Sequence, residues 1–320
     1  MSLRVLVTGA AGFIGSHVCE ALVARGDEVV GVDNFDPFYA RDVKEGNLAA
    51  LRRAAGFRLI EADVTRDPLP CDGMAAVVHL AARPGVRPSL EDPGAYAAAN
   101  VTGTARVLDA ARRAGVRRVV FGSSSSVYGE STLAPFAEEA PAIEPISPYA
   151  ATKRAGELLA HAFAHLYALR IACLRFFTVY GPRQRPDLAV HRFTDAIARG
   201  QPVRVHGDGS SERDYTYISD AVAGALGAVD WTGRTGSACT AFNIGGGERV
   251  RLDRLVELIG RALGREPRIE RHAMQPGDVR LTAADLRRAE RELAYRPRVG
   301  VEDGIRQFVR WYEATHGRQS

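Results

Sequence analysis

The chain has 320 residues, of which 46% are hydrophobic and 25% are charged, and its formal net charge is +4. This composition is that of a globular protein long enough to hold two domains. Because its basic residues are interleaved with acidic ones, we expect small anionic ligands and no nucleic-acid partner.

The cysteines and the N-terminus indicate the cellular compartment. Four cysteines lie far apart, without metal-ligand spacing or the pattern of a disulfide framework, so we predict no metal site. The chain begins directly with a strand pattern rather than a signal peptide, and no apolar run reaches the roughly 18 residues that span a bilayer. We therefore expect a protein of the reducing cytoplasm that has no membrane partner.

Strand and helix patterns alternate over the first 178 residues. The expected strands are continuous apolar runs at 4–10, 28–33, 57–63, 75–82, 117–124 and 170–177. The expected helices, with apolar residues at helical spacing, lie at 13–26, 43–56, 94–115 and 147–167. Apolar strands that alternate with helices are typical of a parallel sheet covered on both faces. We therefore predict an α/β fold with a Rossmann-like, doubly wound parallel sheet.

The elements become shorter after residue 178. Helices are expected near 188–199, 219–229, 251–264 and 282–292, with a strand at 203–205. We predict an NAD-binding domain over 1–178, which carries the catalytic residues, and a smaller α/β substrate lobe over 179–320. Some elements of the second part are expected to return to the first.

The NAD prediction depends on a glycine motif and an acidic residue. The segment TGAAGFIG (8–15) follows the first strand and opens the first helix. Gly9 permits a tight turn, Gly12 lets a pyrophosphate approach the backbone, and Gly15 lets helix and strand pack closely. The free N–H groups of the helix start favour phosphates. Asp33, which ends the second strand, would bind the adenosine ribose and repel a 2′-phosphate, so we predict NAD rather than NADP.

Further residues of the predicted NAD site follow the ends of the next strands, which face the same crevice. Asn100 lies within the long helix, where it either contacts the cofactor or satisfies neighbouring backbone groups. The residues predicted to contact NAD are Gly9, Gly12, Phe13, Ile14, Gly15, Asp33, Asn34, Asp63, Val64, Leu80, Ala81, Ala82 and Asn100.

The segment SPYAATK suggests proton chemistry. Ser147 can cap a helix and Pro148 suits its first position, so Tyr149 and Lys153 lie one turn apart on one face. We expect the helix N-terminus and the lysine charge to lower the pKa of the Tyr149 phenol, which makes it a usable base. Tyr-x-x-x-Lys alone is a weak signal, but it follows a nucleotide-binding half and the segment SSSSVYG (123–129).

Together these motifs resemble the extended short-chain dehydrogenase/reductase family. The matching stretches, in chain order, are TGAAGFIG, DN, DVT, LAA, SSSSVYG, YAATK, RFFTVYGP and RDYTYISD. The resemblance implies a tightly held NAD, a Ser/Thr–Tyr–Lys catalytic group and a nucleotide-sugar substrate. Ser124 matches the catalytic serine and Ser126 the adjacent Ser/Thr position, and Tyr149 and Lys153, which also contact NAD, complete the catalytic set.

Within that family the chain is most similar to the UDP-glucuronic acid 4-epimerases. The similar stretches are VDNFDPFYARDVKEGNL, PGVRPSLEDP and RPDLAVHRF, with departures at Arg83, Pro88, Arg183 and Gln184. The resemblance implies that Tyr149 takes the proton of the sugar 4-hydroxyl, with Ser124 or Ser126 bridging. A hydride moves from C4 to NAD and returns to the other face of a transient 4-keto sugar.

A glucuronate substrate needs a carboxylate holder, since its 4-keto form is a β-keto acid that tends to lose CO₂. We expect Thr178 and Arg185 to hold the carboxylate, because the guanidinium fork pairs with it bidentately, with help from Arg83 or Arg87. The sugar would also contact Ser124, Ser126 and Tyr149. The resemblance implies that the UDP end meets Arg192, Val203, Arg213, Asp278 and Arg280.

Several alternatives remain open. A UDP-glucose or UDP-N-acetylglucosamine 4-epimerase is one, because Thr178 and Arg185 also suit a neutral sugar through water. UDP-glucuronate decarboxylases and 4,6-dehydratases carry a carboxylate beside the Ser/Thr, whereas here no carboxylate follows until Glu130. A non-catalytic NAD-binding regulator usually loses the Tyr or the Lys of the motif, and both are present.

The helices at 94–115 and 148–167 carry more apolar residues than one sheet face requires. The family resemblance implies that they pair across a two-fold axis. We therefore predict a homodimer.

Overall fold

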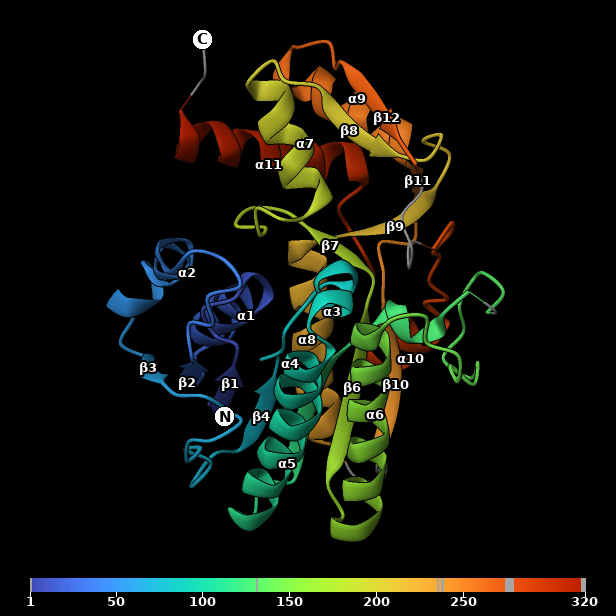
Figure 1. The fold of residues 1–320 in the computed structure, drawn as a ribbon. Coiled ribbons are helices and arrows are strands. Elements are labelled where there is room, and N and C mark those ends of the chain that lie inside the picture. The colour runs from blue at the N-terminus through green and yellow to red at the C-terminus, as the bar shows by residue number, and fades with distance from the viewer. Residues whose placement is uncertain (1, 131, 235, 237–238, 274–278, 318–320) are drawn as a thin grey trace.

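A seven-stranded parallel sheet forms the body of the protein (Figure 1). The computed structural model describes residues 2–130, 132–234, 236, 239–273 and 279–317. The strands, in spatial order, are β10 (Cys239–Ile244), β6 (Arg170–Phe176), β5 (Arg118–Ser124), β4 (Ala76–His79), β1 (Arg4–Thr8), β2 (Glu28–Asp33) and β3 (Phe57–Glu61). The order reverses between β1 and β4, the switch point where doubly wound sheets bind their ligands. The predicted fold class is confirmed.

Helices cover both faces of this sheet, and each face buries its own apolar cluster. One face packs against α1 (Phe13–Ala24) and α8 (Ile218–Thr232), and the other packs against α5 (Gly103–Arg113) and α6 (Pro148–Tyr167). Both β10 and α8 come from the part of the chain after residue 178. The second half of the sequence therefore supplies a strand and a covering helix to the first sheet.

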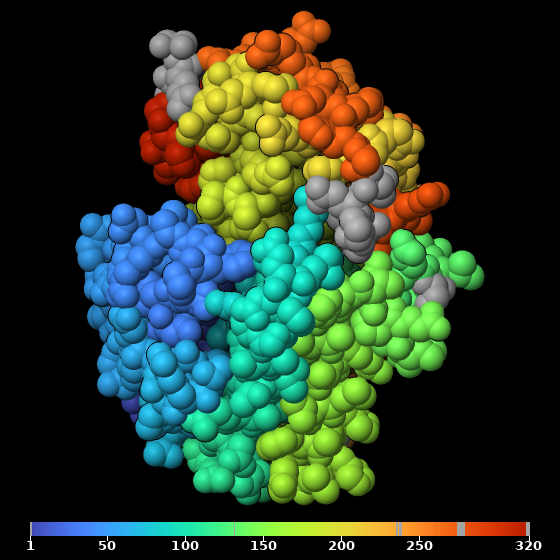
Figure 2. Space-filling model, in the orientation of Figure 1, coloured from blue at the N-terminus to red at the C-terminus, as the bar shows by residue number. Residues whose placement is uncertain are grey.

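A second lobe lies over the carboxyl ends of the strands (Figures 1 and 2). It contains a three-stranded sheet in the order β11-β9-β7 and a two-stranded sheet of β12 and β8. Its elements are β7 (Thr178–Tyr180), α7 (Ala189–Ala198), β8 (Val203–His206), β9 (Glu212–Tyr217), β11 (Arg249–Arg251), α9 (Leu252–Leu263), β12 (Ile269–His272) and α11 (Val301–His316). A further helix, α10 (Arg287–Leu293), packs against α8 and β10 of the main sheet (Figure 1). The apolar residues of this lobe continue the cluster beneath α1 and α8.

Two predicted helices differ from the structure, and a third, expected near 282–292, begins only at Arg287 as α10. The helix expected over 43–56 is α2 (Arg41–Leu48) followed by a short 3₁₀ turn (Leu51–Arg53). The helix expected over 94–115 is α4 (Pro93–Ala97), a π-helical turn (Ala98–Thr102) and α5, preceded by the short α3 (Val86–Glu91).

Local chemistry explains the second difference. The Asp92 carboxylate accepts a hydrogen bond from Ala95 N and caps α4, whose first residue is Pro93. From the start of α5, the Thr104 hydroxyl donates to Asn100 O in the π turn at 2.6 Å. A threonine hydroxyl that bonds a carbonyl one turn back competes with the regular helical pattern, and periodicity alone does not reveal it.

The glycine turn after β1 lets α1 approach the sheet. Gly9 has φ +73°, and a Cβ placed on Gly15 would lie 2.0 Å from Gly9 O. A side chain at position 15 would therefore push α1 away from β1.

Gly15→Ala is expected to lower the free energy of unfolding by about 1–3 kcal/mol, because it forces a backbone shift in a packed turn. Denaturant unfolding of the purified variant measures this change. Gly46→Ala is the matched control, since a Cβ at this helical glycine of α2 meets nothing within 4 Å. It should be neutral or stabilise by up to about 1 kcal/mol. Equal stability of the two variants would contradict the close-approach argument.

Candidate active site

The carboxyl ends of the sheet strands open into a cavity of about 660 Å³. Loops after β1 to β6 line it, together with β7 and the loop that follows. The predicted cofactor and catalytic residues that line it are Gly9, Gly12, Phe13, Ile14, Gly15, Asp33, Asn34, Asp63, Val64, Leu80, Ala81, Ala82, Ser124, Ser126, Tyr149 and Lys153. Residues predicted from six separate segments thus meet in one place.

The glycine turn presents backbone to this cavity. Gly12 precedes α1 in an extended conformation and no side chain caps the helix, so its first N–H groups are available to a ligand. A Cβ on Gly9 would lie 2.7 Å from Ala81 N, so the turn and the loop after β4 are in close contact. This cradle of open N–H groups fits the pyrophosphate of a dinucleotide.

Asp33 is tied to the turn by backbone hydrogen bonds. Its carboxylate accepts hydrogen bonds from Ala11 N at 3.0 Å and Phe35 N at 2.8 Å, and Lys44 Nζ lies 3.9 Å away. Burial raises the pKa of Asp33 and lowers the pKa of Lys44. Asn34 donates to the Asp63 carboxylate at 3.2 Å and joins the loops after β2 and β3.

Both lysines of the chain line the cavity, although all other basic side chains apart from the histidines are arginines. Sequence reasoning identified Lys153 and missed Lys44. The signal was the composition itself, because a chain that uses arginine nearly everywhere has kept lysine at these two positions.

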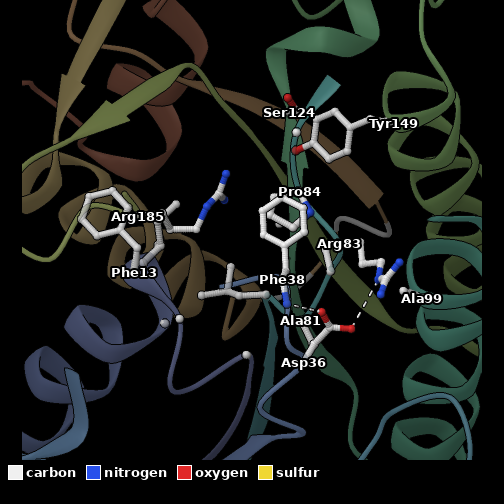
Figure 3. A pocket seen from close by; sticks show the side chains of 18 of the residues that line it. Phe13, Asp36, Phe38, Ala81, Arg83, Pro84, Ala99, Ser124, Tyr149 and Arg185 are labelled. Carbon is white, nitrogen blue, oxygen red and sulfur yellow. Dashed lines mark hydrogen bonds and ion pairs between the residues drawn. The ribbon is translucent and has the colours of Figure 1, made fainter. Parts of the chain in front are cut away.

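The tyrosine and lysine motif has the predicted local geometry. Ser147 caps α6 by accepting from Ala150 N at 3.1 Å, and Pro148 is the first helical residue. The Tyr149 hydroxyl meets Ser124, and both side chains point into the cavity (Figure 3). Ser124 Oγ also donates to Ser126 Oγ at 3.1 Å, so Ser126 is one hydrogen bond further from the phenol.

The expectation that Lys153 lowers the pKa of Tyr149 is wrong for this structure. Burial raises the pKa of Tyr149, and the opposing influences are its hydrogen bond with Ser124 and the charge of Arg185. Lys153 is only 6% exposed and donates to Gly122 O at 2.7 Å. Burial lowers the pKa of Lys153 to about 8, while the charge of Glu157 acts in the opposite direction.

A buried polar cluster beside the predicted catalytic residues was not predicted. The Glu157 carboxylate, one turn after Lys153, accepts from Ser123 Oγ at 2.7 Å and from Arg175 Nε and Nη2 at 2.9 Å each. Arg154 Nη1 also donates to it at 2.8 Å. This cluster joins α6 to the ends of β5 and β6.

Arg185 and Thr178 line the same cavity on the side of the second lobe. The Nε and Nη2 atoms of Arg185 each lie 2.9 Å from a carboxylate oxygen of Asp187, and its guanidinium lies 5.5 Å from the centre of the Phe38 ring. Burial disfavours the charge, but the bonds to Asp187 raise the pKa of Arg185 on balance. Among the described residues, no protein acceptor bonds Nη1, so one edge of the guanidinium can serve a ligand.

Asn100 is not among the residues that line the cavity, and its side chain has the second of the two roles expected for it, the satisfaction of neighbouring backbone groups. Its side-chain oxygen accepts from Arg83 N at 2.7 Å, and its amide donates to Arg83 O and to Thr152 Oγ1 at 3.0 Å each. Asn100 therefore holds the loop after β4, while Arg83 itself reaches the cavity.

The described residues among those predicted for the UDP end do not line this cavity. Val203 is fully buried beside Ile269, which makes its side chain part of the core, and Arg192 lines a separate hollow of about 630 Å³ on the second lobe. Arg87 lies on α3 and Arg213 lies on β9. Asp278 lies outside the described residues, and Arg280 follows it by two positions.

Lys153→Met tests the cost of burying the lysine charge. A pKa lowered from 10.5 to about 8 means that the folded protein carries this cost fully below pH 8 and loses it as the pH rises to 10.5. The unfolding free energy of the parent should therefore gain about 2 kcal/mol relative to the variant between pH 7 and pH 10. Parallel urea titrations of both proteins measure it, and a constant difference across this range would contradict the assignment.

Two kinds of site are not found in the part of the chain that the structure describes. No group of three or more histidines, cysteines or acidic residues is arranged to hold a metal ion there. No described helix combines the length and the apolar character that crossing a membrane requires.

Comparison with known proteins agrees with this geometry. A probable UDP-glucuronate 4-epimerase of Rhizobium meliloti is 39% identical over 99% of this chain and 98% of its own length. A UDP-glucuronate 4-epimerase of Thermodesulfobacterium geofontis is 38% identical over 96% of this chain and 95% of its own. The crystal structure of a Bacillus cereus UDP-glucuronic acid 4-epimerase, in complex with UDP-glucuronic acid and NAD, matches with a TM-score of 0.92 at 34% identity, covering 98% of this chain and all of that one. The sequence model of the NAD dependent epimerase/dehydratase family matches residues 5–245, and this chain belongs to that family.

Proposed function

We propose that the protein is a UDP-glucuronate 4-epimerase that uses NAD to interconvert UDP-glucuronate and UDP-galacturonate. The observation that carries this proposal is the position of Arg185, whose open edge lies in the same cavity as Tyr149. The relatives named as UDP-glucuronate 4-epimerases support the same substrate.

The residues of the cavity fit NAD, and different residues would bind different parts of it. NAD, when bound, supplies a reversible hydride acceptor. We assign the pyrophosphate to the open N–H groups of α1, the adenosine ribose to Asp33 and Lys44, and the adenine to the strand ends near Asp63. Lys153, at the bottom of the cavity, would hold the nicotinamide ribose.

Proton transfer belongs to Tyr149 and Ser124. The phenol is the base for the sugar 4-hydroxyl, and Ser124 is the bridge because it bonds the phenol directly, whereas Ser126 reaches it only through Ser124. Since burial raises the pKa of Tyr149, the phenolate needs positive charge nearby. Arg185 supplies such charge from the sugar side.

The sugar carboxylate is assigned to Arg185 with Thr178. Asp187 occupies the Nε side of the guanidinium and fixes its orientation, which leaves the Nη1 side for a second carboxylate. Held in this way, the carboxylate keeps its bond to C5 out of line with the 4-keto π system and retains CO₂. Arg192, Val203, Arg213, Asp278 and Arg280 remain our assignment for the UDP end, and Arg87 remains an alternative to Arg83 as a helper at the carboxylate.

A UDP-glucose or UDP-N-acetylglucosamine 4-epimerase is the second candidate, since Thr178 and Arg185 can bind a neutral sugar through water. A decarboxylase or dehydratase fits less well. The four residues that end β5 and begin the next turn are serines, so this loop offers no carboxylate. The buried Glu138 carboxylate accepts a hydrogen bond from Asn243 N and does not line the cavity.

We further propose a cytoplasmic homodimer. The four cysteines are free, as in reducing compartments. Leu158, Leu166 and Tyr167 of α6 are exposed by 56%, 65% and 43%, which leaves an apolar stripe for a second copy. Light scattering at micromolar concentration tests the dimer, and a clean monomer would exclude it.

Turnover of three substrates tests the proposed function. UDP-glucuronate, UDP-glucose and UDP-N-acetylglucosamine are offered separately to the purified protein, and NMR detects sugar inverted at C4. We expect inversion of UDP-glucuronate. Inversion of the neutral sugars alone would favour the second candidate.

Tyr149→Phe should lower kcat by about 10²- to 10⁴-fold, because it removes the general base while leaving the helix start unchanged. NAD bound to the purified variant should equal that of the parent, which separates loss of chemistry from loss of cofactor. A variant that keeps its turnover would exclude the phenol as the base.

Arg185→Gln should lower kcat/KM for UDP-glucuronate by about 10- to 100-fold, the effect of losing charge-assisted hydrogen bonds. Its effect on any turnover of UDP-glucose should be smaller, because that sugar has no carboxylate and loses only the positive charge that Arg185 places near the Tyr149 phenol. Equal losses on both substrates would mean that Arg185 supports the site in general and does not select the charged sugar.

A further inference from the structure

We propose that Arg83 and Asp36 form a clasp across the dinucleotide groove that slows the release of NAD. Arg83 Nε lies 3.3 Å from Asp36 Oδ2, and both side chains line the cavity (Figure 3). This inference depends on the NAD part of the proposed function and not on the identity of the sugar.

Sheet topology places the clasp over the groove. The strand β1 lies between β2 and β4, so the loops after β2 and β4 flank the glycine turn on either side. Asp36 belongs to the first of these loops and Arg83 to the second. A dinucleotide binds across the carboxyl end of β1 with its pyrophosphate on that turn. A link between the flanking loops therefore passes across the ligand.

Both ends of the clasp are anchored. The Asn100 side chain bonds the N–H and the carbonyl of Arg83, so its backbone is fixed from behind. On the other side, Asp36 Oδ1 accepts from Phe38 N at 2.9 Å, and Asp36 O accepts from Lys44 Nζ at 2.8 Å. Because both backbones are fixed, the two side chains stay within reach of each other. The pair therefore needs less ordering to form than an ion pair between side chains on mobile surface loops.

Exposure places the clasp on the outer side of the groove. The side chains of Arg83 and Asp36 are 28% and 26% exposed, while the strand ends beneath the groove are buried. Arg83 Nη1 also lies 3.6 Å from Asp92, whose side chain is 61% exposed. The guanidinium thus faces solvent on one side and the cavity on the other.

Retention suits the proposed chemistry. In an epimerase the cofactor regains its oxidised form within each turnover, so it has no need to leave. A groove closed by an ion pair keeps the cofactor in place while sugars exchange through the other end of the cavity.

The experiment measures exchange of bound NAD against isotopically labelled NAD, without any sugar. The purified holoenzyme is compared with Arg83→Gln, Asp36→Asn and the double variant, at low and high salt. Each single variant should exchange about two- to fivefold faster than the parent, the range expected for a partly exposed ion pair. The double variant should exchange no faster than the single variants, because either substitution alone already removes the ion pair. High salt should speed the parent and leave the variants unchanged.

Controls separate the clasp from other effects. Arg112→Gln removes an arginine that pairs with Asp109 on α5 and should exchange like the parent. Arg83→Lys keeps the charge and should lie between the parent and Arg83→Gln. Thermal unfolding of each variant identifies any loss of fold.

Three results would overturn the clasp. Unchanged exchange in both single variants would mean that the pair does not hold the cofactor. Faster exchange in Arg83→Gln alone would assign Arg83 to direct contact with a phosphate. Additive effects in the double variant would show that the two residues act separately. Because no sugar is present, each result stands whether or not the protein turns over UDP-glucuronate.

Discussion

The contact on which the catalytic geometry depends is the buried ion pair between Glu157 and Arg175. Ser123, which bonds Glu157, precedes Ser124, our proposed proton bridge, at the end of β5, and Arg175 lies at the end of β6, just before the segment that leads to Thr178. Glu157 itself is one helical turn from Lys153. A buried pair is weak as a source of stability, because both charges lose their hydration. Here it fixes three elements relative to one another, so Ser124, Tyr149 and Lys153 line the same cavity.

The same burial explains why this site needs a positive charge beside the phenol. Taking Tyr149 and Lys153 out of water favours the neutral form of each, so the pKa of the phenol rises and that of the ammonium falls. Arg185 is the positive group that acts on the phenol in this structure. One guanidinium would then both hold the sugar and make the base more acidic, which couples recognition of the substrate to its activation.

The sequence was enough to predict the features that are local in the chain. The glycine turn, the strand-end Asp33 and the cap at Ser147 each follow from a few neighbouring residues, and parallel strands bring their carboxyl ends together. Contacts between segments that lie far apart in the chain could not be predicted from the sequence. The packing of Lys44 against the loop after β2, the grip of Asn100 on Arg83 and the addition of β10 to β6 depend on tertiary structure. The pKa of Tyr149 was misjudged because a sequence shows nearby charges but not desolvation.

The distribution of lysines has a practical consequence. Lys44 and Lys153 carry every side-chain amine of the protein, both are 6% exposed, and both line the cavity. Apart from the N-terminus, a reagent directed at primary amines therefore meets its targets only inside this groove. The extent of such labelling becomes a direct measure of how fully the groove is occupied, in a protein whose outer surface carries its positive charge as guanidinium groups that the reagent does not attack.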